Sequence, residues 1–250
     1  MPSSDPEGLP RLYRDLASWF PLLTPPEDYA EEAELYAGLI EERSGLGRTE
    51  TLLELGSGGG HNASHLKRRF KLTLVDLSPD MLQVSRRLNP ECEHLVGDMR
   101  WARLGRQFDT VLIHDAISYM TSEKDLRAAL DTAFVHSAPG GVALFAPDYV
   151  RESFKPATQT GGSDGEARAL RYLEWSWDPD PADTTYTVDM AYLLRDEAGE
   201  VDVALDRHIL GLFPRATWQR LIESAGFRFE AAPLGHSAPG GELFIGVRPR

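Results

Sequence analysis

Hydrophobic positions recur along the chain with two different spacings, which predict helices in some stretches and strands in others. Residues 9–20 have helical spacing that ends at Pro21, and residues 27–43 form a second amphipathic helix. Farther along, short apolar runs alternate with such helices, a pattern typical of a parallel sheet covered on both faces. These sheets bind ligands at the carboxyl ends of their strands. The predicted strands are Thr51–Leu55, 72–75, Glu93–Val96, Phe108–His114 and 142–146, separated by helices at 61–70, after Ser78 and at 122–137.

This alternation ends at about residue 150. A polar, glycine-rich loop at 160–165 is followed by β-rich runs at about 168–177, 184–195 and 201–210, which predict an antiparallel meander. The expected fold class is α/β, a Rossmann-like three-layer sandwich with a mostly parallel seven-stranded sheet and this inserted meander. A helix at 214–225 and strands at 227–231 and Glu242–Val247 close the domain. Its predicted parts are N-terminal helices (1–48), a core (49–149), an inserted antiparallel lid (150–212) and the closing elements (213–250).

Composition indicates the cellular compartment and the kinds of partner to expect. The 250 residues include one cysteine, Cys92, so neither an intramolecular disulfide nor a cysteine metal cluster is expected. The first residues lack the features of a signal peptide, and no apolar run approaches the length of a membrane span, which predicts a cytoplasmic protein without a membrane partner. The net charge of −13 argues against nucleic-acid partners, and the basic run at 67–71 is interpreted as the solvated end of a helix.

A glycine-rich loop follows the first predicted strand of the sheet. Glu54, Gly56, Gly58 and Gly60 form the pattern E-x-G-x-G-x-G where a strand passes into a helix. Glycines in such a loop allow positive φ and let the backbone approach a ligand closely, although a tight turn alone would also use them. A phosphate-binding P-loop would end in Gly-Lys-Ser/Thr, which is absent, and a dinucleotide-binding loop would place Gly or Ala where this chain has His61.

The loop resembles motif I of the class I S-adenosylmethionine (SAM)-dependent methyltransferases. Asp76, Gly97-Asp98-Met99, the strand Phe108–His114 and Pro139-Gly140-Gly141 match the family's later motifs in order. The resemblance implies a SAM cofactor, which leaves as S-adenosylhomocysteine, with Asp76 on the ribose and Asp98 and Met99 at the adenine. A helix N-terminal charge is the alternative for Asp76. The cofactor-binding residues that the resemblance implies are Glu54, Gly56, Ser57, Gly58, Gly60, Asp76, Leu77, Met81, Asp98, Met99, Arg100 and His114.

Three segments are similar to the sugar-amine N,N-dimethyltransferases of antibiotic biosynthesis. They are residues 93–112, 208–213 and 241–247. The resemblance implies that the inserted meander roofs the acceptor site and that the N-terminal helices close over SAM. Residues 19–29 depart from those enzymes, which leaves the particular acceptor open. The oligomeric state is also open, with a homodimer as one candidate.

Methyl transfer needs a base only when the acceptor arrives protonated. His114, at the end of the fourth strand, is the best-placed candidate; a hydrogen bond to the SAM carboxylate or backbone is its alternative role. His208 is second, with a structural role as the alternative. No metal site is predicted, since the spacing of Asp115 and Asp148 does not require one. Aromatic residues that could line the acceptor pocket, or simply form core, are Tyr13, Tyr119, Trp175, Trp177, Tyr192 and Phe213.

The leading hypothesis is an enzyme that methylates N or O of a small molecule. A SAM-binding regulatory protein without turnover would share every cofactor residue and is the alternative. An NAD(P)-dependent reductase is disfavoured chiefly by His61. A nucleic-acid or protein methyltransferase is disfavoured because residues 114–117 do not form an Asn/Asp-Pro-Pro-Tyr/Phe signature.

Overall fold

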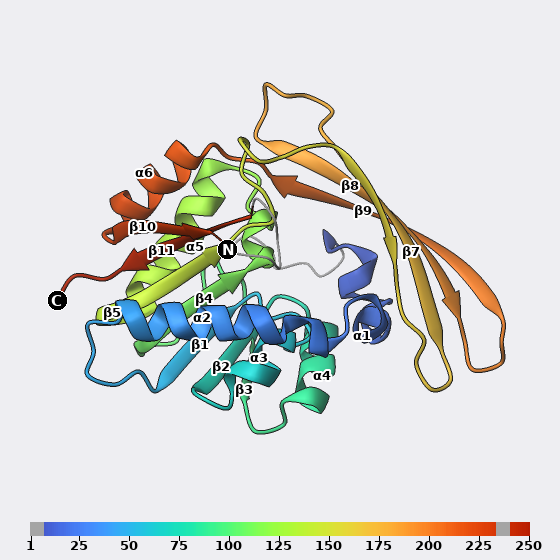
Figure 1. Ribbon diagram of the computed structural model, residues 1–250, viewed down its shortest axis with the longest axis horizontal. Helices are drawn as coiled ribbons and strands as arrows, with labels where there is room; N and C mark the ends of the chain where they lie inside the picture. Colours follow the sequence, from blue (N-terminus) through green and yellow to red (C-terminus); the bar gives the residue numbers. More distant parts are fainter. Residues whose placement is uncertain (1–7, 234–240) are drawn as a thin grey trace.

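A computed structural model describes residues 8–233 and 241–250, which form two β-sheets joined by helices (Figure 1). The first sheet has seven strands in the order β10-β11-β5-β4-β1-β2-β3. Among these seven described strands, β11 runs in the direction opposite to the other six. This sheet confirms the predicted α/β class. Its strands are β1 (Thr51–Leu55), β2 (Lys71–Asp76), β3 (Glu93–Val96), β4 (Phe108–His114), β5 (Ser137–Ala146), β10 (Arg228–Pro233) and β11 (Glu242–Val247).

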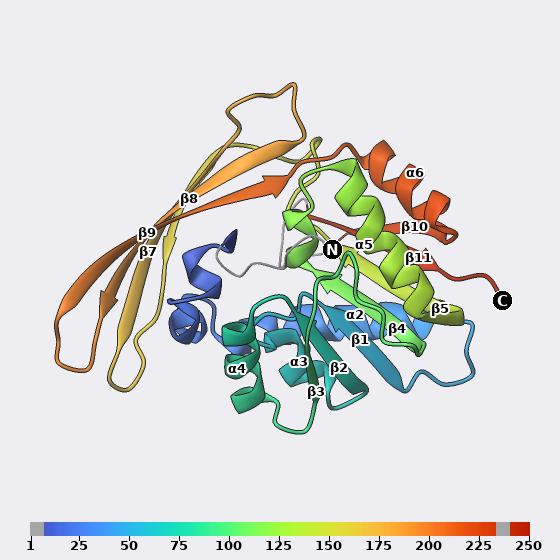
Figure 2. The same ribbon diagram turned by 180° about the vertical axis from the view of Figure 1, so that it is seen from behind.

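Helices cover both faces of the seven-stranded sheet because its central strands are apolar on both sides. In β1, Leu52 packs toward α2 and α3, whereas Leu53 and Leu55 pack toward α5 and α6. Figure 2 shows α5 and α6 on one side of the sheet and α2 on the other. Helix α4 begins at its predicted cap, where the Ser78 hydroxyl accepts a hydrogen bond from Met81 N. The helices are α1 (Phe20–Leu23), α2 (Ala30–Arg43), α3 (His61–Leu66), α4 (Pro79–Leu88), α5 (Glu123–His136) and α6 (Arg215–Ala225).

The inserted segment forms a four-stranded antiparallel sheet in the order β6-β7-β8-β9. The meander was predicted with three strands, and these are β7 (Ala169–Trp177), β8 (Thr185–Arg195) and β9 (Val201–Gly211). The fourth, β6 (Ala157–Gly161), includes the start of the stretch predicted to be a loop, so that prediction was wrong there. Its sequence is polar, and it lies at the sheet edge with one pairing partner, so no buried apolar row marked it.

The N-terminal segment differs from the single helix predicted over residues 9–20. It forms two 3₁₀ turns, η2 (Arg11–Tyr13) and η3 (Ala17–Trp19), followed by α1, in whose first turn Pro21 lies. Leu12 and Leu16 are buried against the antiparallel sheet, so their spacing reflects packing on that sheet rather than one continuous helix. A further 3₁₀ turn, η4 (Pro26–Tyr29), leads into α2.

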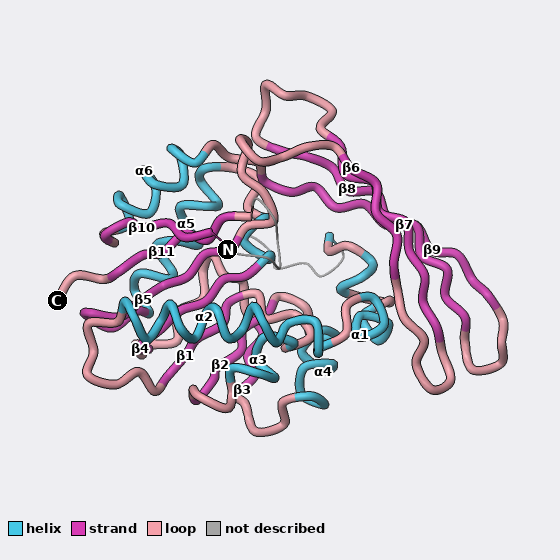
Figure 3. The backbone as a smooth tube through the Cα atoms, in the orientation of Figure 1, coloured by secondary structure: helices cyan, strands magenta, loops and turns pink. Residues whose placement is uncertain are grey.

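The N-terminal segment lies between the two sheets in the views of Figures 1 and 3. Apolar side chains from this segment and from β7, β8 and β9 form a core that is separate from those of the seven-stranded sheet. No helix in the described ranges is long and apolar enough to cross a bilayer. Residues 1–7, part of the stretch that lacks signal-peptide features, lie outside the described residues.

Candidate active site

A cavity of about 880 Å³ opens between the carboxyl ends of the parallel strands and the inner face of the antiparallel sheet. This volume is in the range of ligand sites in proteins, which extends to roughly 1,000 Å³. The glycine loop after β1 and the segments after β2, β3, β4 and β5 line one side. Side chains of β7, β8 and β9 line the other, and the N-terminal segment contributes Leu12, Tyr13 and Phe20.

The glycine loop has a backbone that other residues would strain. Gly56, Gly58 and Gly60 have φ of +75°, +52° and +73°. A Cβ atom on Gly56 would lie 2.3 Å from Ala116 Cβ and 2.8 Å from Met99 Cε, so no side chain fits there. The loop therefore presents bare backbone to the cavity.

Carboxylates at the ends of β2 and β3 border the loop. Asp76 accepts hydrogen bonds from Gly58 N (2.7 Å) and Ser78 N (2.8 Å). Burial raises the pKa of Asp76, and these backbone donors oppose that rise. Asp98 receives the Arg100 guanidinium, with Nη2 to Oδ2 at 2.6 Å. Asp76 is fixed by the loop itself, so its charge is presented to the cavity in one orientation.

Glu54 is buried at the end of β1 and lines the cavity. Its Oε2 atom and the Ser57 Oγ atom have no hydrogen-bond partner among the described residues. Burial, against a lowering contribution from His114, raises the pKa of Glu54 to about 8. A buried carboxyl oxygen without a partner is costly, and a cationic or hydrogen-bond-donating ligand group would relieve that cost.

His114, the last residue of β4, bridges two carboxylates. Its Nε2 atom lies 3.0 Å from Glu32 Oε2 on α2 and 3.1 Å from Asp115 Oδ1. Burial alone lowers the pKa of His114, but the charges of Asp115 and Glu32 outweigh burial and raise it to about 10. The imidazole is therefore a cation at neutral pH, and in return it lowers the pKa of Glu32 against the effect of burial.

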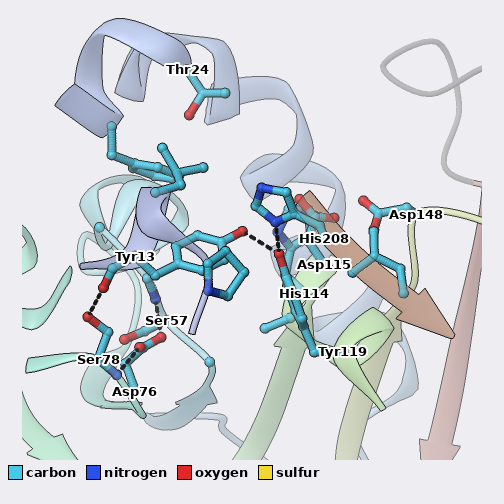
Figure 4. Close-up of a pocket in the computed structure, with 18 of the residues that line it drawn as sticks. Tyr13, Thr24, Ser57, Asp76, Ser78, His114, Asp115, Tyr119, Asp148 and His208 are labelled. Carbon is cyan, nitrogen blue, oxygen red and sulfur yellow. Dashed lines mark hydrogen bonds and ion pairs between the residues drawn. The ribbon is translucent and has the colours of Figure 1, made fainter. Parts of the chain in front are cut away.

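Asp115 and Asp148 face each other after β4 and β5. Burial raises the pKa of both carboxyls, and the nearby charge of Asp148 raises that of Asp115 further. Asp115 is the one non-glycine residue with positive φ among those described, at +22°. Its side chain is half-exposed because it lines the cavity, where it contacts His114 (Figure 4).

A chain of hydrogen bonds joins the cavity to the antiparallel sheet (Figure 4). Tyr119 Oη lies 3.0 Å from Tyr13 Oη and 2.6 Å from His208 Nδ1. His208 Nε2 lies 3.5 Å from Asp206 Oδ2, which also accepts a hydrogen bond from Leu12 N. These contacts hold the N-terminal segment, the segment after β4 and β9 together around one cavity.

The structure brings most of the predicted site residues to this cavity. Two of the cofactor candidates, Gly60 and Met81, are not in its lining. Gly60 precedes α3 and faces Ser85 of α4, and Met81 is buried beside Gly58. The lining includes Glu54, Gly56, Ser57, Gly58, Asp76, Leu77, Asp98, Met99, Arg100, His114, Tyr13, Tyr119, Tyr192 and His208.

Three acceptor candidates, Trp175, Trp177 and Phe213, lie elsewhere. Trp175 is 50% exposed on the opposite face of the antiparallel sheet, where it stacks on Trp177. Phe213 is buried in the core beside Trp218. Conversely, Glu32 and Glu174 line the cavity without having been predicted. Strand alternation offered a signal for Glu174, because it is next to Trp175 in the strand and its side chain therefore lies on the opposite face of the sheet. No sequence pattern indicated that Glu32 of α2 lies at the end of β4.

Known proteins resemble this chain in sequence. A family described as "Methyltransferase domain" matches residues 52–141. The dTDP-3-amino-3,6-dideoxy-alpha-D-glucopyranose N,N-dimethyltransferase of Streptomyces fradiae is 30% identical, covering 88% of this chain and 85% of the relative. The dTDP-3-amino-3,4,6-trideoxy-alpha-D-glucopyranose N,N-dimethyltransferase of Streptomyces venezuelae is also 30% identical, covering 88% and 92%.

Solved structures resemble it as well. Streptomyces venezuelae DesVI superposes with a TM-score of 0.83 at 27% identity, covering 94% of this chain and 98% of the other. The sugar N-methyltransferase KedS8 from a Streptoalloteichus species gives 0.82 at 26% identity, covering 100% and 98%.

The fold, the glycine loop and the cavity define a class I SAM-dependent methyltransferase. The chain belongs to the family of small-molecule methyltransferases that includes these sugar N,N-dimethyltransferases. Its cofactor is SAM and its acceptor is a small molecule, which confirms the enzyme interpretation.

Proposed function

We propose that the enzyme methylates the amine nitrogen of an amino sugar carried on a nucleotide. The observation that carries this proposal is the acidic lining of the cavity. Carboxylates of Glu32, Asp115, Asp148 and Glu174 face it, and the nearby cation His114 is already engaged by two of them. Excess negative charge in a confined space attracts an ammonium group and gives a neutral hydroxyl no comparable advantage. The curated relatives are named for dTDP-linked amino sugars, which matches this preference.

The residues of the glycine loop fit SAM. Gly56 and Gly58 present backbone without a side chain to the cavity, and the unpartnered Glu54 Oε2 suits the cationic amino-acid end of SAM. We assign the ribose to Asp76 and the adenine to Asp98 and Met99. SAM held by these residues would supply a methyl group on a sulfonium for the acceptor nitrogen, with S-adenosylhomocysteine as the neutral leaving group.

The chain's own residues position the acceptor and keep water away. The N-terminal segment covers the cavity through Tyr13, whose carbonyl accepts a hydrogen bond from Ser78 Oγ at 2.5 Å. Alignment of reactants in a closed site is itself a large source of rate enhancement. The division into N-terminal cover (1–48), SAM-binding core (49–149), lid (150–212) and closing elements (213–250) describes this arrangement.

The two histidines have different roles in this proposal. His114 acts as a fixed cation that holds Glu32 and Asp115, because its raised pKa leaves no free lone pair at neutral pH. His208 orients the Tyr119 hydroxyl toward Tyr13 at the acceptor side of the cavity.

A homodimer is part of the proposal. The outer face of the antiparallel sheet exposes apolar side chains on β7, β8 and β9. Leu193 of β8 pairs directly with Val203 of β9, and they are 50% and 59% exposed; Leu173 of β7 and Leu205 of β9 flank Ala191 of β8, at 45% and 70% exposure. A contiguous apolar patch of this kind marks an association surface. We expect sedimentation to show a dimer that Leu205→Asp converts to a monomer; a monomeric parent protein would contradict the assignment.

The acceptor is tested by supplying SAM with dTDP-3-amino-3,6-dideoxyglucose or with the sugar nucleotide that has a hydroxyl in place of the amine. We expect S-adenosylhomocysteine release and a methylated product only with the amine. Turnover of the hydroxyl compound at a similar rate, or of neither compound, would overturn the proposed acceptor.

A further inference from the structure

Asp115 and Asp148 form a pair of carboxyl groups at the cavity. They follow β4 and β5, whose carboxyl ends lie side by side in the sheet, and both line the cavity. Burial and the nearby charge of Asp148 raise the pKa of Asp115 to about 8, so the pair holds one proton at neutral pH. Ionising both carboxyls becomes more favourable when a further cation enters the cavity beside them.

The two partners are held differently. Asp148 N donates to Ser118 Oγ at 3.1 Å, and the Tyr186 hydroxyl lies 3.4 Å from Asp148 Oδ2. Hydrogen bonds from hydroxyls favour the ionised form of Asp148. Asp115 instead sits on a strained backbone at φ +22°, and its side chain projects into the cavity. Strain of this kind persists where the surroundings impose it, and it occurs preferentially at functional sites.

Charged and titratable groups surround the pair from every packed element. His114 and Glu32 contact or face Asp115 from β4 and α2, and the charge of His114 also lowers the pKa of Asp148. The groups that face the pair from the lid and the N-terminal side are Glu174, Tyr186, Tyr13 and Tyr119. None of these four carries a positive charge, so His114 is shared among several carboxyls and an incoming ammonium adds a second cation beside the pair.

We propose that the Asp115–Asp148 pair binds the acceptor ammonium and takes one proton from it before methyl transfer, an inference that rests on the proposed function. Binding of the ammonium displaces the shared proton to solvent. An N–H bond of the ammonium then breaks as an O–H bond forms on the pair, which frees the nitrogen lone pair and restores the proton of the pair. Methyl transfer makes the nitrogen cationic again, so each methylation releases one proton in total. After the first methyl transfer the product is a secondary ammonium, which must also lose a proton before it can be methylated, and the same pair takes that proton.

The test measures protons as well as rates. Calorimetry in buffers of different ionisation enthalpy gives the number of protons released when dTDP-3-amino-3,6-dideoxyglucose binds the S-adenosylhomocysteine complex at neutral pH. The variants are Asp115→Asn and Asp148→Asn, with Asp131→Asn on the exposed surface of α5 as the matched control. Asparagine tolerates positive φ, so the backbone at position 115 is kept.

We expect the parent protein and the control to release about one proton on binding, because the ammonium displaces the shared proton, and both pair variants to release almost none. Their kcat/KM should fall about 100-fold or more near neutral pH and recover as pH approaches the amine's own pKa. Amine binding without proton release in the parent, or an unchanged pH profile in Asp115→Asn, would overturn the pair's role alone. Absence of amine binding and turnover in the parent would overturn the proposed function instead.

Discussion

His114 carries the positive charge among the carboxylates at the end of β4, and His114→Gln removes it. Glu32 would then remain buried, and Asp115 at the cavity wall, without a cation, at 3.0 and 3.1 Å from where the imidazole nitrogen had been. Breaking a buried ion pair by removing one partner costs about 3–5 kcal/mol. The rise in the His114 pKa from 6.5 to about 10 corresponds to about 5 kcal/mol at roughly 1.36 kcal/mol per pH unit, which agrees in size.

The sign of the pH dependence follows from the direction of this shift. The folded-state pKa is above the unfolded value, so the stabilisation is complete below about pH 6.5 and is lost as pH rises toward about 10. The difference in unfolding free energy between the parent protein and His114→Gln should therefore be largest near pH 6 and small near pH 10. Urea unfolding followed by circular dichroism measures it directly.

Two further variants make this prediction specific. In Glu32→Gln/His114→Gln the excess negative charge is reduced, so we expect the double variant to be more stable than His114→Gln alone. His94→Gln is the control, because His94 hydrogen-bonds Ser85 and the Cys92 carbonyl and its pKa is lowered by burial. A loss below about 1 kcal/mol for His114→Gln, or additive effects in the double variant, would refute the ion-pair reasoning.

Three other perturbations test the cofactor side of the cavity. Gly56→Ala should abolish measurable SAM binding in calorimetry and also destabilise the fold, because its Cβ would overlap Ala116 Cβ at 2.3 Å and φ is +75°; SAM affinity equal to the parent's would be inconsistent with bare backbone at this site. Asp76→Asn should weaken SAM about 10-fold or more, since hydrogen bonds to a charged group contribute about 1.5–3 kcal/mol, and an unchanged dissociation constant would remove Asp76 from the ribose site. Deleting residues 1–28 should lower SAM affinity markedly by uncovering the cavity, and equal affinity in an otherwise folded deletion variant would argue against closure by this segment.

The sequence predicted those elements best whose burial leaves a strong pattern. Strand β4 has the predicted bounds, Phe108–His114, because it is apolar on both faces. Strand β6 was missed because it is polar and pairs on one edge. The helical spacing of residues 9–20 was real, but it reflects contact with the antiparallel sheet, and only tertiary packing decides between those outcomes.

The candidate site shows the same limit. Local sequence motifs predicted the glycine loop, Asp76 and Asp98, since each depends on a strand and the residues that follow it. The position of Glu32 depends on how α2 packs over β4, and no local pattern encodes that contact. Alternation predicted that Trp175 and Trp177 share a face, but which face meets the cavity is set by the packing of the whole sheet.

The most direct test is a crystal structure of the protein with S-adenosylhomocysteine and dTDP-3-amino-3,6-dideoxyglucose. We predict ribose hydroxyls on Asp76, adenine beside Asp98 and Met99, and the amine nitrogen between the sulfur and the Asp115–Asp148 pair. An adenosyl group bound away from the glycine loop, or an amine that faces away from both carboxyls, would contradict this prediction.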